Sequence, residues 1–137
     1  MKKNNKSIVI AVLIMIVMSL SGGVIYATVQ TNNTKMSVSK VEALPGSTIN
    51  VDVSIENNPG ILGAVLSLSY DDGLTLVNAT SGSAFSDLVM TPPGSYSSPC
   101  NFTWDGIEVD PNNVQDGAVL TLTFAVSDAA SVGDVFD

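Results

Sequence analysis

The chain has 137 residues, which suits a single domain with one small core. It carries 13 acidic side chains against five lysines, contains no arginine or histidine, and has a net charge of −8. Such an acidic chain repels phosphate backbones and anionic membrane surfaces, so its composition disfavours both as partners. The lack of histidine also removes the usual general base of an enzyme.

The first 27 residues predict a secretory signal peptide. Three lysines, at positions 2, 3 and 6, precede an apolar run over residues 8–20, and Ser-Gly-Gly ends that run. Ile25-Tyr26-Ala27 then offers a cleavage site with a small last residue, which completes the usual layout. The alternative is an uncleaved membrane anchor, since residues 8–27 nearly suffice to span a bilayer. We therefore expect a protein that is secreted or held at the cell surface.

Residues 28–35 are polar and are interpreted as a leader, and residues 36–137 as one domain. In several segments of this domain apolar and polar residues alternate with a period of two. This pattern is typical of a half-buried β-strand, because successive side chains of a strand point to opposite faces. Strands are expected over residues 36–41, 48–56, 63–70, 74–79, 101–105 and 118–126. The connections between them are rich in Pro, Gly, Asn and Asp, which suit turns. With no convincing amphipathic helix, the pattern predicts an all-β chain folded as an antiparallel β-sandwich.

Alternation also predicts which side chains are buried. Phe102 and Trp104 share one face of their strand and are expected in the core. In the strand over residues 118–126, the side chains expected to point inward are Ala118, Leu120, Leu122, Phe124 and Val126. Those expected to point outward are Val119, Thr121, Thr123 and Ala125. Cys100 is expected to be a small apolar filler, because a lone cysteine cannot form an internal disulfide.

The order of the motifs resembles the cohesin module of bacterial cellulosomes. Pro-Gly-Ile-Leu-Gly-Ala at 59–64 is followed by Ser-Tyr-Asp, Gly-Leu-Thr-Leu-Val, Gly-Ser-Ala-Phe and Asn-Phe-Thr-Trp-Asp-Gly, and then by the segment 116–133. The resemblance spans residues 36–133 and rests on this succession. It implies a non-catalytic jelly-roll sandwich that recruits a dockerin-bearing protein to an extracellular polysaccharide-degrading complex. It implies no cofactor on this chain, and calcium on the dockerin partner.

The resemblance also implies a binding surface on the outer face of one sheet. The strands over residues 63–70, 101–105 and 118–126 would form it, and alternation selects their outward residues. These are Gly63, Val65, Ser67, Ser69, Asn101, Thr103, Asp105, Val119, Thr121 and Thr123, with Tyr96 as an aromatic anchor at the rim. Many cohesins of the first type carry Asn and Asp at the positions of Gly63 and Val65, so a more apolar recognition surface is implied here.

The family's fold has further strands after the turn at Gly133, so this chain resembles the front part of a module. A sandwich without its last strands leaves sheet edges unpaired. We therefore expect residues 28–137 on their own to be unstable or to aggregate, and a sharp two-state melt would contradict this.

Other functions stay open at this point. A carbohydrate-binding module would expose aromatic rings along a flat strip, so an exposed Trp104 would favour it. A glycosidase needs two facing carboxylates, and the candidate acids are expected to be solvated at turns or strand ends: Glu42, Glu56, Asp71, Asp105, Glu108 and Asp110. A calcium loop from Asp105 is not supported, because Ile107 and Val109 occupy ligand positions. A generic surface adhesin or spacer domain would share the export signal, the acidity and the sandwich.

Overall fold

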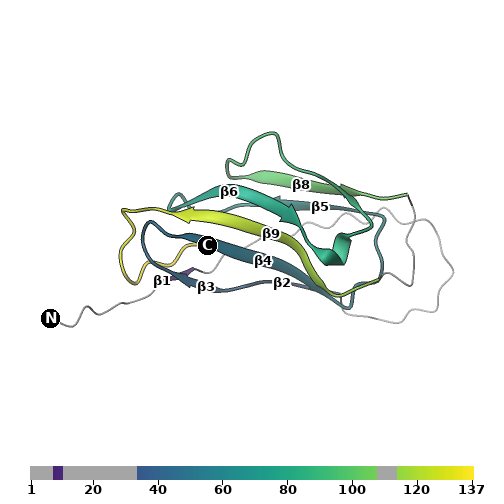
Figure 1. Ribbon diagram of the computed structural model, residues 1–137, viewed down its shortest axis with the longest axis horizontal. Helices are drawn as coiled ribbons and strands as arrows, with labels where there is room; N and C mark the ends of the chain where they lie inside the picture. The colour runs from purple at the N-terminus through teal and green to yellow at the C-terminus, as the bar shows by residue number, and fades with distance from the viewer. Residues whose placement is uncertain (1–7, 11–33, 108–113) are drawn as a thin grey trace.

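The computed structural model describes residues 8–10, 34–107 and 114–137, and Figure 1 shows their strands arranged in two layers. The predicted signal-peptide cleavage site at Ala27, the leader up to residue 33, and Glu108 and Asp110 lie outside the described residues. No helix in the described part of the chain is long and apolar enough to cross a membrane.

The strands in the described residues pair antiparallel throughout, and they form two main sheets and one short ribbon. The first sheet has the order β2 (Lys35–Val38), β4 (Thr48–Glu56), β9 (Gly117–Val126), β6 (Leu74–Ser81). The second has the order β5 (Gly63–Leu68), β8 (Cys100–Asp105), β7 (Val89–Thr91). The ribbon pairs β1 (Ile8–Ile10) with β3 (Val41–Ala43), and a short 3₁₀ helix, η1 (Ser83–Phe85), follows β6. The prediction of an antiparallel β-sandwich is confirmed.

The core lies between the two main sheets, where the predicted alternation places it. Trp104, Phe102 and Phe124 are the largest fully buried side chains. The ring of Phe85 packs edge-on against Trp104 with centroids 5.5 Å apart, and the indole Nε1 of Trp104 donates to Oγ of Ser81 at 3.1 Å. Each large side chain buried here stabilises the fold by about 1.5–3 kcal/mol. Burial of Trp104 removes the exposed ring that a sugar-binding strip would need.

A β-bulge makes the prediction that Val119 points outward wrong. Leu120 lies opposite Val53 and Ala118 lies opposite Ser54, so Val119 is an extra residue in β9. An extra residue breaks the period of two. Val119 and Leu120 are consequently both fully buried, whereas Ala118, expected inside, is half-exposed.

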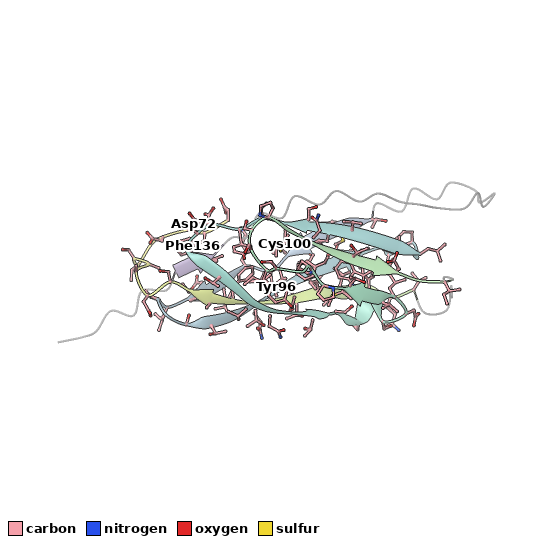
Figure 2. All side chains as sticks on the ribbon, turned by 90° about the horizontal axis from the view of Figure 1, so that it is seen from above. Asp72, Tyr96, Cys100 and Phe136 are labelled. Atoms are coloured by element: carbon pink, nitrogen blue, oxygen red, sulfur yellow. The ribbon has the colours of Figure 1, made fainter. Side chains whose placement is uncertain are left out.

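The last residues pack against the turn between β5 and β6. The backbone N–H of Asp71 donates to the carbonyl of Asp137 at 2.9 Å, and the N–H of Asp137 donates to Oδ2 of Asp71 at 3.1 Å. Figure 2 shows Phe136 beside Asp72. The ring of Phe136 covers Gly73, where a methyl carbon would lie 2.0 Å from the ring. A side chain at Gly73 would therefore displace Phe136.

The turn after β4 is tied to the segment that enters β9. The backbone N–H of Asn58 donates to Oδ1 of Asp116 at 2.9 Å, and Nδ2 of the buried Asn58 donates to the carbonyl of Gln115 at 3.0 Å. Oδ1 of Asn58 accepts from the N–H of Gly60 at 3.1 Å. These bonds fix the start of β5 relative to the opposite sheet.

This connection predicts a pH-dependent stability. The N–H groups of Asn58 and Asn57 hold the pKa of Asp116 below its ordinary value. The pKa of Asp116 in the folded protein lies below its value of about 3.9 in the unfolded chain. The hydrogen bonds to its carboxylate therefore stabilise the fold above about pH 4, and this stabilisation is lost as the pH falls through the folded pKa. Asp116→Asn should lower the melting temperature at neutral pH, and the difference should shrink in acid. Melting curves of the full-length protein at several pH values measure this. Asp72→Asn is the control, and an equal effect of both variants at every pH would contradict it.

Candidate functional site

The outer face of the β5-β8-β7 sheet consists of three rows of side chains. Strand pairing places Gly63, Asp105 and Val89 in the first row, Val65, Thr103 and Thr91 in the second, and Ser67 and Asn101 in the third. Six of these were predicted as surface residues from the sequence: Gly63, Val65, Ser67, Asn101, Thr103 and Asp105. The structure brings these six onto one face, and their part in binding stays a prediction.

This face carries mostly short side chains. Half of the face is only partly exposed: this holds for Gly63, Val65, Ser67 and Thr103. Asn101 and Asp105 on β8 are exposed. The hydroxyl of Ser67 donates across the strands to Oδ1 of Asn101 at 2.7 Å, which orients that amide. A surface of this kind suits contact with another protein, because few long side chains must be ordered on binding.

β7 contributes exposed residues that the sequence analysis missed. Residues 88–90 are a short apolar patch in a long polar connection, and the structure places part of this patch in an edge strand. Val89 and Thr91 point outward there, and Val89 is 72% exposed. Met90 between them packs against the core. The outward-inward-outward order of three residues is too short to separate from a loop by pattern alone.

The prediction that the 118–126 strand shares this face is wrong. β9 lies between β4 and β6 in the opposite sheet. Thr121 donates to Oδ1 of Asp52 at 2.6 Å, and Thr123 donates to Oδ1 of Asn50 at 2.9 Å, both on the outer face of that sheet. Alternation is the same whichever strand lies alongside, so it could not reveal this pairing.

Tyr96 and Ser69 also lie apart from the three rows. Tyr96, labelled in Figure 2, is half-buried. Its ring stacks on the buried Phe102 with centroids 6.3 Å apart, and its carbonyl accepts from the hydroxyl of Tyr70. It therefore packs partly against the core, and its part in binding as a rim anchor stays a prediction. Ser69 is exposed just beyond the end of β5.

Cys100, labelled near Tyr96 in Figure 2, is a buried residue at the start of β8. Burial raises the pKa of its thiol, which keeps it protonated and unreactive. Its predicted place as an apolar filler is confirmed.

Two of the candidate acidic residues make structural contacts. Glu56 pairs with Lys35 at 3.6 Å near the sandwich surface, and Asp71 accepts from the backbone of Asp137. Within residues 8–10, 34–107 and 114–137, no cluster of three or more His, Cys, Asp or Glu could hold a metal ion. The outer face of β5-β8-β7 therefore remains the candidate site.

A match to a known family indicates what kind of domain carries this face. Residues 34–136 match the family model of the cohesin domain. The chain belongs to the cohesin family. The cohesin family is a family of protein-interaction modules and not of enzymes. A search of curated proteins found no match.

Solved cohesins share the fold. The sixth cohesin of scaffoldin B from Acetivibrio cellulolyticus, solved with a mutant Cel5 dockerin, is 21% identical, with a TM-score of 0.59 over 74% of this chain and 76% of that one. The third ScaC cohesin of the same organism, solved with a ScaB dockerin, is 25% identical, with a TM-score of 0.55 over 67% and 68%. A non-cellulosomal cohesin from Archaeoglobus fulgidus is 24% identical, with a TM-score of 0.51 over 64% and 60%.

Proposed function

We propose that this cohesin domain recruits a dockerin-bearing protein through the outer face of β5-β8-β7, within an extracellular polysaccharide-degrading complex. Family membership over residues 34–136 carries the proposal. Two of the similar structures are cohesins solved with a bound dockerin, which supports the same partner class here. The basic, apolar and small-residue order of the first 27 residues supports export.

The chemistry of the face supports noncovalent docking of a neutral or basic protein surface. Val65 and Val89 offer apolar area, and Ser67, Asn101 and Thr103 offer short hydrogen-bonding groups around it. An interface with an apolar centre and polar surroundings is what specific protein contacts require. In this proposal the cohesin binds no cofactor, and calcium belongs to the dockerin.

Calorimetric titration of the full-length protein against a panel of dockerins, with calcium and with a chelator, tests the proposal. The Cel5 and ScaB dockerins of Acetivibrio cellulolyticus belong in the panel. We expect tight binding to one dockerin class that disappears when calcium is chelated. Absence of binding across the whole panel would contradict the proposal and would direct attention to polysaccharide pull-down assays.

A further inference from the structure

Asp105 occupies an unusual position in the first row of the face. It lies between Gly63 on β5 and Val89 on β7. A methyl carbon built on Gly63 would lie 3.8 Å from Oδ1 of Asp105 and 3.1 Å from the backbone carbonyl oxygen of Trp104. Oδ1 of Asp105 therefore lies next to the outer side of Gly63, at ordinary van der Waals distance from the place of a methyl carbon.

Exposed apolar residues lie at the same end of the sheet as this carboxylate. Val89 is 72% exposed directly beside it, and Ile107, two residues further along the chain, is fully exposed. Leu62 precedes Gly63, is 36% exposed, and accepts at its carbonyl from the N–H of Gly106 at 2.8 Å. Three of the exposed large apolar residues of the described chain thus gather at the end of the sheet where Asp105 lies.

The face supplies no cation of its own to this carboxylate. Asp105 is the one charged residue among the outward positions of β5, β7 and β8. The lysines in the described ranges are Lys35 on β2 and Lys40 just after it, both beside the opposite sheet. A carboxylate that becomes covered when a partner docks costs free energy unless the partner provides a charge or a donor.

We propose that Asp105, Gly63, Leu62, Val89 and Ile107 form a specificity subsite that takes a lysine or arginine side chain from the docking protein. The aliphatic stem of such a side chain packs on Val89, Ile107 and Leu62 while its charged end reaches Asp105 over Gly63. This subsite rests on the proposed docking function and names the chemistry that the partner must present at this end of the face. A dockerin with an acidic residue there is rejected by like-charge repulsion.

The test uses the dockerin that binds most tightly in the panel, with calcium present, at about 50 mM and about 500 mM NaCl. Asp105→Asn keeps the shape and removes the charge, and should weaken binding about tenfold at low salt and much less at high salt. Asp72→Asn makes the same charge change at the turn between β5 and β6 and should leave the affinity unchanged. In the partner, exchanging the contacting lysine or arginine for glutamate should abolish binding, and Asp105→Lys should restore it.

The possible results separate the subsite from the docking function. Unchanged affinity and salt dependence of Asp105→Asn, with tight binding of the unaltered protein, would overturn the subsite and leave the docking face standing. Tighter binding of Asp105→Asn would also overturn it, because the partner would then present an apolar or acidic group. If no dockerin binds, the subsite fails together with the function on which it rests.

Discussion

Val65→Asp should weaken dockerin binding about thirtyfold or more without unfolding the protein. Val65 lies in the middle row of the face, opposite Thr103, and its side chain is half-buried on the solvent side of β5. A carboxylate at this position would be covered by the partner without a counter-charge and would stand near Asp105. Loss of a central contact of this kind costs about 2 kcal/mol or more, which is about a thirtyfold loss of affinity.

Val77→Asp is the matched control, because Val77 is an exposed valine, 49% accessible, on β6 of the opposite sheet. Titration should show the loss for Val65→Asp alone, and both variants should melt as the unaltered protein does. If Val77→Asp weakened binding and Val65→Asp did not, the docking face would lie on the β2-β4-β9-β6 sheet.

Trp104→Ala should destabilise the fold by about 3–5 kcal/mol, a large share of the 5–15 kcal/mol typical of a domain. Trp104 is fully buried in the β5-β8-β7 sheet, contacts Phe85 and Phe102, and hydrogen-bonds Ser81 from the other sheet. Removal of the indole leaves a cavity and leaves these rings without their neighbour. The two sheets lose one of the contacts that hold them together.

Denaturant unfolding of the full-length protein measures this effect. Trp104→Phe is the intermediate control: it keeps most of the aromatic packing but loses the hydrogen bond to Ser81, so its midpoint should fall between those of the other two proteins. Equal midpoints for Trp104→Ala and the unaltered protein would show that this ring is dispensable for the core.

Local patterns determined much of this fold. Period-two alternation identified β4, β5, β6, β8 and β9 nearly to their ends, and it placed Phe102, Trp104 and Phe124 in the core. It succeeded because the pleat of one strand decides which side chains are buried, whatever strand lies alongside. The order of motifs also carried the family resemblance, and the family match confirms it.

Strand pairing and register were decided only in three dimensions. That β9 pairs with β4 and β6, which moves Thr121 and Thr123 to the opposite face, depends on contacts between residues far apart in the sequence. The bulge that buries Val119 is a mismatch between two strands and leaves no mark on either strand alone. Asp105 lies between Gly63 and Val89 only because β5, β8 and β7 are neighbours in the sheet. A sequence pattern reports on one strand at a time, whereas a surface is made by the strands that lie side by side.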